Sequence, residues 1–257
     1  MSHSCPKAES GARTCHSAAV PERNVFGQPV WLKKKVFEAL ELPTRKWMFT
    51  ANDLWATGTE HLVDLPQRGV LFVANHQTIF TDVIAMYHTF LASSYGHEQP
   101  TQPKRFVKNP RHNLYFVAAK ETMQSGVLPR IMALGGAVLT ERTWRHGDEM
   151  VDRSMKQDDV DAIATAIDDG WVVTFPQGTT RPDAPVRKGT AHIIKQFQPI
   201  VVPIRVDGFR DAFDKTGLKR TQKGVKLTVD VRPPLLFDHD NDSIELIVEK
   251  LTDAIAA

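Results

Sequence analysis

The segment GVLFVANHQTIFTDVIAMYHTFLA, residues 69–92, decides the predicted fold class. Its first part, residues 69–74, is a short uninterrupted apolar run, which is typical of a strand buried on both faces. Its last part, residues 82–92, is predicted to be a helix. A buried strand that leads into a helix is the unit from which parallel sheets are built, so the segment predicts an α/β protein.

The same alternation continues toward the C-terminus. Further strands are predicted at 115–119, 136–140, 171–175, 200–206 and 226–235, and helices at 127–135, 157–169, 191–196 and 243–257. This order predicts a central, mostly parallel or mixed sheet flanked by helices. The alternating pattern of KLTVDVRPPL, residues 226–235, indicates a strand at the edge of that sheet.

Residues 30–57 are predicted to be helical in two pieces that are divided by Pro43, which gives an N-terminal helical hairpin within residues 25–58. Lysines at 33–35 lie close to Trp31, and a basic pair precedes Trp47. Tryptophan beside lysine is typical of surfaces that lie on lipid, with the ring at the headgroup level. Two interpretations stay open, a hairpin packed on the domain and a hairpin that faces a membrane.

The composition excludes several classes of protein. A net charge of +2 over 257 residues lacks the concentrated basic surface of a nucleic-acid binder, so we expect no nucleic-acid partner. The two cysteines, Cys5 and Cys15, exclude a disulfide framework, a cysteine-based metal site and a buried cysteine nucleophile. This cysteine usage suits a reducing cytoplasm.

The domain organisation is predicted to be simple. Residues 1–24 are polar, contain no apolar segment of signal-peptide length and are expected to be a disordered tail. Residues 25–257 are expected to form a single domain, with a core at 60–237 and a C-terminal helix at 243–257. No apolar run approaches the roughly 18–20 residues that span a bilayer, so any work on membrane lipids is expected from the surface.

Polar residues follow three of the predicted strands. His76 follows the strand at 69–74, Arg142 follows 136–140, and a polar loop follows 171–175. Sites in parallel sheets gather beyond the carboxyl ends of the strands. If these strands run parallel, the three groups are expected to converge at one edge.

His76 and Asp82 have the residue types of a general-base pair. A histidine can remove a proton near neutral pH, and it does so best when an acid fixes its tautomer. Asp82 could hold His76 in this way if it opens the next helix. The alternative is that Asp82 only caps that helix.

Arg142 and the loop FPQGTTRPDAPVRKGTAH, residues 175–192, are candidates for anion binding. Arginine binds phosphate through a planar fork of donors, and a glycine lets the backbone approach an anion. The alternatives are a surface salt bridge of Arg142, with Glu141 or Asp148, and a solvated basic loop. The candidate phosphate-binding residues of the loop are Gly178, Thr179, Thr180, Arg181 and Lys188.

Together these stretches resemble the glycerolipid acyltransferase superfamily, which includes the enzymes that acylate lysophosphatidic acid. Its four blocks occur in order over residues 60–237, and Lys120 also stands where the family often has a lysine. The matching positions are NHQTIFTD at 75–82, Gly136 with Glu141 and Arg142, FPQGTT at 175–180, and IVVPI at 200–204.

The chain departs from the family pattern at three points. The family usually has four residues between its histidine and aspartate, whereas five separate His76 from Asp82. Thr81 holds the usual acid position, and we assume that a bulge of one residue brings Asp82 into place. The family's glutamate in the third block is Gln177 here, and its arginine is Thr180, with Arg181 one position later.

The resemblance implies transfer of an acyl group from acyl-CoA or acyl carrier protein to a lysophospholipid or glycerophosphate, most of all 1-acylglycerol-3-phosphate, in phospholipid biosynthesis. His76 would be the base and Asp82 would hold it, while Arg142 and the loop would bind the acceptor phosphate. No metal and no cofactor are expected. Supporting roles are expected for Asn75, Lys120, Gln177 and Pro203.

The implied location is cytoplasmic, peripherally at the inner face of a membrane. Two other functions stay open: a hydrolase or transacylase on the same scaffold, and a lipid-binding relative without catalysis. The apolar groove for the acyl chain has two candidate locations, and both sets of residues are also compatible with an ordinary core. These are the hairpin with Trp31, Trp47, Phe49 and Trp55, and the helix after Asp82 with Met86 and Tyr87.

Overall fold

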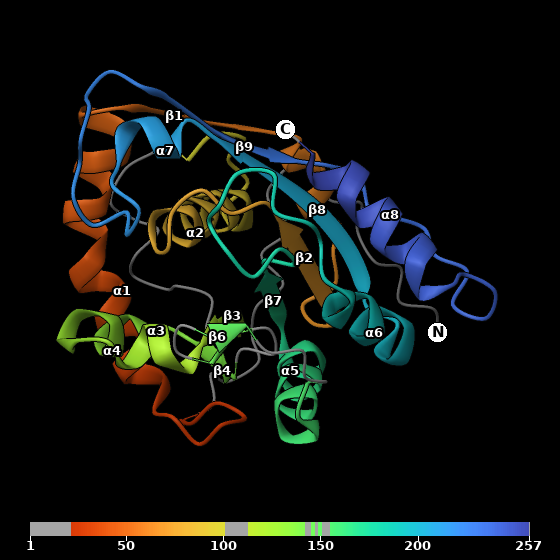
Figure 1. The fold of residues 1–257 in the computed structure, drawn as a ribbon. Coiled ribbons are helices and arrows are strands. Elements are labelled where there is room, and N and C mark those ends of the chain that lie inside the picture. The colour runs from red at the N-terminus through yellow and green to blue at the C-terminus, as the bar shows by residue number, and fades with distance from the viewer. Residues whose placement is uncertain (1–21, 101–112, 142–144, 147–148, 151–154, 257) are drawn as a thin grey trace, which may run out of the picture.

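The computed structural model describes residues 22–100, 113–141, 145–146, 149–150 and 155–256 (Figure 1). Within this part of the chain, seven strands form one sheet in the order β1-β9-β8-β2-β7-β3-β4. Their bounds are β1 (Asp53–Thr57), β2 (Val70–Ala74), β3 (Leu114–Ala119), β4 (Ala137–Thr140), β7 (Trp171–Thr174), β8 (Ile200–Asp207) and β9 (Lys226–Val231). A separate antiparallel pair is formed by β5 (Arg145–His146) and β6 (Glu149–Met150).

The sheet is mostly parallel. Strands β8, β2, β7, β3 and β4 all run in one direction, and β9 pairs with β8 in the opposite direction, with β1 parallel to β9. Every residue of β2 and β7 is buried, as expected for central strands covered on both faces. The predicted α/β fold with a mostly parallel or mixed sheet is therefore confirmed.

Helices cover both faces of the sheet and give three layers (Figure 1). On one face, α2 (Thr81–Ser94) packs through Ala85, Met86 and Phe90. On the other face, apolar residues of α5 (Gln157–Asp169), α6 (Lys188–Phe197) and α8 (Ile244–Ile255) cover the sheet. Three short helices, α3 (Lys120–Gln124), α4 (Val127–Ala133) and α7 (Phe209–Ala212), lie in the connections.

The expected N-terminal hairpin is wrong in its second half. Helix α1 (Val30–Arg45) continues through Pro43, a π-helical turn follows at Lys46–Thr50, and residues 53–57 then form β1. The hydroxyl of Thr44, next to Pro43, donates to the carbonyl of Leu40 at 2.8 Å and stabilises the backbone at this point. The apolar residues of 53–57 alternate in burial, which is a strand pattern that we assigned to a helix.

The prediction of an edge strand at 226–235 is also wrong. β9 lies between β1 and β8, and β1 is at the edge. The alternating burial of β9 arises because one of its faces is covered less than the other. Alternation reports which faces of a strand are buried, whereas an edge is defined by unpaired backbone groups, so the pattern did not test the pairing.

Residues 22–24, which we included in the tail, contact the domain: Glu22 accepts from the Val30 amide at 3.0 Å and Asn24 is buried. The rest of the predicted tail lies outside the described residues.

Among the helices that the structure describes, none combines the length and apolar character needed to cross a membrane.

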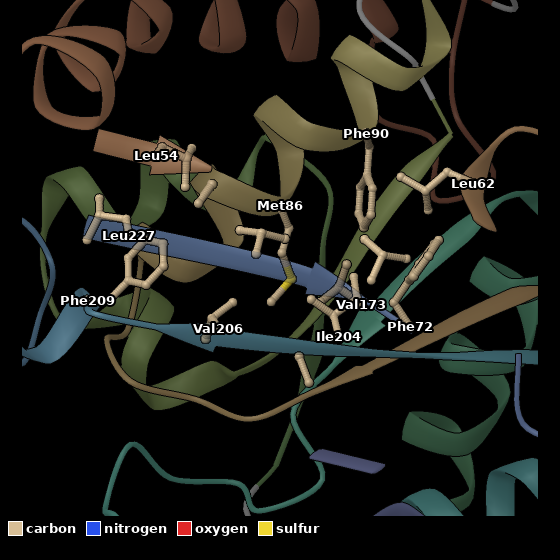
Figure 2. Close-up of a cluster of buried hydrophobic side chains, with 14 of the residues drawn as sticks. Leu54, Leu62, Phe72, Met86, Phe90, Val173, Ile204, Val206, Phe209 and Leu227 are labelled. Atoms are coloured by element: carbon tan, nitrogen blue, oxygen red, sulfur yellow. The ribbon is translucent and has the colours of Figure 1, made fainter. Parts of the chain in front are cut away.

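The core on the α2 face is dense in aromatic rings (Figure 2). Phe72 of β2 lies with its ring centroid 4.5 Å from Phe90 and 5.1 Å from Trp171. It is fully buried at the centre of the sheet.

We expect Phe72→Ala to lower the free energy of unfolding by about 3–5 kcal/mol, because it removes a buried ring and leaves a cavity among rigid neighbours. Urea unfolding followed by circular dichroism measures this change. Leu236→Ala is the control, because Leu236 is 88 % exposed and its truncation is expected to cost about 0.5 kcal/mol or less. Equal effects of the two variants would contradict the packing described for Phe72.

Candidate functional site

One open cleft of about 1060 Å³ lies at the carboxyl ends of four neighbouring parallel strands. His76 follows β2, Phe175 follows β7, Ala119 ends β3 and Glu141 follows β4, and all four line this cleft. The sheet therefore brings the His76 loop and the 175–181 loop together, although about a hundred residues separate them in the chain. Arg142, the third expected group, lies outside the described residues.

His76 and Asp82 form a hydrogen-bonded pair at the wall of the cleft. His76 Nδ1 lies 3.0 Å from Asp82 Oδ2. A carboxylate can only accept, so this contact places a hydrogen on Nδ1, and in the neutral imidazole Nε2 then keeps its lone pair. The side chain of His76 is 13 % exposed and that of Asp82 is fully buried, so solvent reaches the imidazole and not its partner.

The Asp82 carboxylate also holds the loop that precedes its helix. Oδ2 accepts from the backbone amides of Gln77 at 2.6 Å and Thr78 at 3.0 Å, and Oδ1 accepts from the Thr78 hydroxyl at 2.6 Å. Asp82 lies within the first turn of α2, and the N-cap position is occupied by Phe80. These contacts are those of a residue that fixes the loop and the imidazole rather than those of a helix cap.

Thr81, which stands at the family's usual acid position, is buried and turned toward Thr78, with the two hydroxyl oxygens 2.5 Å apart. The structure thus brings Asp82, and not Thr81, to His76. On its other side the His76 ring stacks on Phe175, with centroids 3.8 Å apart and planes at 19°. The imidazole is held by a hydrogen bond at one nitrogen and by a ring contact over one face.

Asn75 and Pro203 support the site from within the sheet. The Asn75 side chain donates to the carbonyl of Val206 at 2.9 Å and accepts from its amide at 2.7 Å, which fixes the end of β2 against β8. Pro203 is buried in β8 beside Val73. Neither residue lines the cleft, so their contribution is to position the strand that carries His76.

Part of the FPQGTT loop lines the cleft. Gly178, at φ +65°, Thr179, Thr180 and Arg181 line the cleft. Gln177, at the family's glutamate position, instead donates its amide to the carbonyl of Ala184 at 2.7 Å and closes the loop on itself. In the described part of the chain, no hydrogen bond or ion pair reaches the exposed guanidinium of Arg181.

The two lysines that we expected at the site both have acidic partners. Lys188 forms an ion pair with Glu245 of α8 at 2.8 Å, and this hydrogen bond raises the pKa of Lys188. Lys120 lies 3.7 Å from Glu141 and 3.8 Å from Asp159. Lys188 still lines the cleft, whereas Lys120 contributes to an ion-pair network at its border.

Arg210 is a site residue that the sequence reasoning missed. One of its guanidinium nitrogens donates to the carbonyl of Thr180 at 2.9 Å and lies 3.4 Å from that of His76, so it joins the two loops. The Gln77 side chain accepts from the Arg210 amide at 3.2 Å. Arg210 follows β8, which is parallel to β2. The rule that site residues follow the carboxyl ends of parallel strands, which selected His76, would also have selected Arg210 if applied to β8.

A narrow apolar cavity of about 70 Å³ lies between α1, α2 and the sheet and meets the cleft at Ile79, Val83 and Phe116, which line both. Tyr87 lines it and stacks on Phe37 with ring centroids 4.1 Å apart. Of the other groove candidates, Met86 is in the core, Trp47 and Phe49 pack against it, and Trp31 and Trp55 are exposed.

Comparison with known proteins agrees with this arrangement. The model of the family described as "Acyltransferase" matches residues 56–207, which is more than half of the chain. The chain belongs to the Acyltransferase family. The match contains the His76–Asp82 loop and the FPQGTT loop and confirms the resemblance to the glycerolipid acyltransferases.

Individual proteins are also similar to this acyltransferase. The mouse (Mus musculus) protein 1-acyl-sn-glycerol-3-phosphate acyltransferase alpha is 26 % identical over 151 residues, which are 54 % of this chain and 52 % of the mouse protein. The chain thus spans about half the length of this relative. The crystal structure of the 1-acyl-sn-glycerophosphate (LPA) acyltransferase PlsC from Thermotoga maritima matches with a TM-score of 0.52 at 16 % identity, over 88 % of this chain and 76 % of that one, and shows the same fold.

Within the described ranges, no three His, Cys, Asp or Glu side chains are grouped so that they could hold a metal ion.

His88, which lines the apolar cavity, differs from His76 in its surroundings. It is buried, its Nε2 lies 3.1 Å from the Thr44 hydroxyl, and burial, followed by the charge of Arg45, lowers its pKa to about 4.

His88 is expected to make the protein less stable in acid. The unfolded chain binds a proton at His88 below about pH 6.5 and the folded chain only below about pH 4, so stability falls as the pH drops through this window. The loss should approach about 3 kcal/mol. Urea unfolding at pH 7 and pH 4.5 should show a smaller pH dependence for His88→Gln than for the wild type. The same dependence in both would contradict a neutral buried His88.

Proposed function

We propose that this acyltransferase moves an acyl group from acyl-CoA or acyl carrier protein to the hydroxyl of a lysophospholipid or glycerophosphate, foremost 1-acylglycerol-3-phosphate. The observation that carries the proposal is the His76–Asp82 pair, which leaves Nε2 of His76 with its lone pair beside a cleft that the FPQGTT loop lines. The mouse relative and the Thermotoga maritima protein, whose names state this acceptor, support the choice.

In the proposed reaction, His76 Nε2 takes the proton of the acceptor hydroxyl while its oxygen attacks the thioester carbonyl. Asp82 stabilises the imidazolium that forms, since it accepts from Nδ1. The tetrahedral intermediate collapses as the carbon–sulfur bond breaks, and the imidazolium returns the proton to the leaving thiolate. His76 thus acts first as a base and then as an acid, and the acyl group passes directly to the acceptor.

The charge of the cleft supports a phosphorylated acceptor. Among the described residues that line it, Glu141 is the one acidic side chain, and Lys156 pairs with it at 2.7 Å. Cationic side chains predominate and would attract phosphate. Those that line the cleft are Arg181, Arg187, Lys188 and Lys215. Arg142 remains part of the proposed phosphate site on the strength of the resemblance.

The apolar cavity is the proposed site for the acyl chain. It opens from the cleft at Ile79 and Val83, which lie in the loop and helix that carry the catalytic pair. The cavity, at about 70 Å³, is too small for a long acyl chain, so the acyl chain would enter by displacing side chains. The half-exposed Val83 and Ile79 at its entrance can move at small cost compared with the buried core.

A location at the inner face of a membrane is proposed from the lipid nature of the substrates. The structure offers exposed apolar side chains that suit such a surface, since Trp31 of α1 and Val127 of α4 are 64 % and 75 % exposed. Lys34 and Lys35 follow Trp31 on the same helix and could contact anionic headgroups.

The deciding experiment measures thiol release from palmitoyl-CoA with and without lysophosphatidic acid. We expect release that requires the acceptor, and we expect His76→Ala to lower kcat by about 10³-fold because it removes the general base. His61→Ala is the matched control, since His61 does not line the cleft. Near-normal turnover of His76→Ala would exclude it as the base.

The other outcomes of this assay separate the alternatives. Thiol release without acceptor would indicate a hydrolase. If neither CoA nor acyl carrier protein thioesters react, saturable lysolipid binding would instead indicate a lipid-binding relative without catalysis.

Arg181 and Lys188 are expected to differ in their effect on acceptor binding. The Arg181 guanidinium is available for the acceptor phosphate, whereas Lys188 already has Glu245 as a partner. Arg181→Ala should therefore raise KM for a phosphorylated acceptor by about tenfold, in line with the loss of a charged hydrogen bond, and Lys188→Ala should change it by about twofold or less. Steady-state kinetics with varied lysophosphatidic acid measure both. The reverse order would assign the phosphate to Lys188.

A further inference from the structure

The extra residue between His76 and Asp82 is held by a turn that lies far away in the sequence. Residues 214–218 pack on the His76–Asp82 loop, and two backbone hydrogen bonds join the segments. The amide of Ile79 donates to the carbonyl of Lys215 at 3.1 Å, and that of Phe80 donates to the carbonyl of Thr216 at 3.1 Å. The part of the loop that carries the extra residue is thus anchored at two consecutive amides.

The turn itself is rigid because Asp214 organises it. Its carboxylate accepts from the Thr216 hydroxyl at 2.8 Å and from the amides of Gly217 and Lys219 at 3.0 Å and 3.2 Å. The Gly217 amide also donates to the Asp214 carbonyl at 2.9 Å. The turn reaches the active cleft, since Lys215 lines it together with His76.

Gly217 makes the closest approach to the loop. Its φ is +78°, and a Cβ atom there would lie 2.2 Å from the Thr81 hydroxyl oxygen and 2.9 Å from the Thr81 amide nitrogen. Side chains are excluded by the space and by the backbone conformation. Gly224 has nearly the same φ, +73°, with nothing within 4 Å of such a Cβ.

A continuous chain of hydrogen bonds leads from this contact to the imidazole. The Thr81 hydroxyl lies 2.5 Å from that of Thr78, Thr78 donates to Asp82 Oδ1, and Asp82 Oδ2 accepts from His76 Nδ1. Because Thr78 uses its hydrogen on Asp82, Thr81 donates to Thr78. A displacement of Thr81 would therefore pass through two hydrogen bonds to the carboxylate that orients His76.

We propose that the turn Asp214–Leu218 is a positioning element for the His76–Asp82 pair, with Gly217 as its contact residue, and that it makes the five-residue spacing compatible with a working pair. The catalytic part of this inference rests on the proposed function. The structural part, that the turn fixes the tautomer and orientation of His76, does not.

The test compares Gly217→Ala with Gly224→Ala, which carries the same backbone strain without the contact. We expect Gly217→Ala to lower kcat by about 10–100-fold with KM of both substrates changed by about twofold or less, because small misplacements of catalytic groups cost rate rather than binding. Gly224→Ala should keep kcat within about twofold. Equal losses in the two variants would overturn the proposal.

A second measurement is independent of turnover. Ring-nitrogen NMR of histidine-labelled protein, with His76 assigned through His76→Gln, should show a single tautomer with hydrogen on Nδ1 in the wild type and in Gly224→Ala. Gly217→Ala should show a mixture of tautomers. An unchanged His76 signal in Gly217→Ala would overturn the inference, and absence of acyl transfer in the wild type would overturn the proposed function alone. If Gly217→Ala does not fold, Asp214→Asn loosens the turn without added bulk, and an unchanged His76 signal there also overturns the inference.

Discussion

The buried carboxylate of Asp82 is the constraint on which the site depends. A fully buried charge is tolerated only when hydrogen-bond donors surround it, and the side chain of Asp82 is fully buried in the first turn of α2. The loop from His76 to Thr78 supplies those donors with two amides, one hydroxyl and one imidazole. The need to satisfy the carboxylate therefore determines the path of the loop. The orientation of the imidazole follows from that path. Burial of Asp82 therefore fixes the position of the His76 side chain.

The sheet explains why this ordered loop meets a cationic one. Strands β2 and β7 are neighbours and run parallel, so the segments that leave their carboxyl ends start side by side. Phe175 then stacks on His76, and Arg210, which leaves the parallel strand β8, joins the carbonyl groups of the two loops. Three connections that are remote in sequence are thus held together by a ring contact, by the Arg210 guanidinium and by the Gln77 side chain, which accepts from the amides of Phe209 and Arg210. None of them alone would have positioned the cleft.

Much of the fold could be predicted because each central strand is a short apolar run followed by a helix, and burial on both faces leaves this pattern in the sequence. The hairpin could not be excluded in the same way, since the apolar run from Trp47 to Phe49 is soon followed by a strand in which the buried Leu54 and Ala56 alternate with exposed residues. Local periodicity does not show where a helix gives way to an edge strand that pairs with residues 226–231. The turn Asp214–Leu218 could not be predicted from the sequence either, because the contact of Gly217 with Thr81 depends on tertiary packing between segments more than a hundred residues apart.

The departures from the family pattern are linked by geometry. With Gln177 in place of an acid, the third block closes on the carbonyl of Ala184 through a neutral amide. With Thr180 in place of an arginine, the carbonyl of that residue accepts from Arg210, and Arg181 presents its guanidinium at the rim of the cleft. Positive charge is therefore retained at the cleft that His76 lines, one position later in the chain. The enlarged His76–Asp82 loop lines the same cleft and contacts this block through Phe175, so the longer spacing in one loop and the shifted arginine in the other alter one shared space.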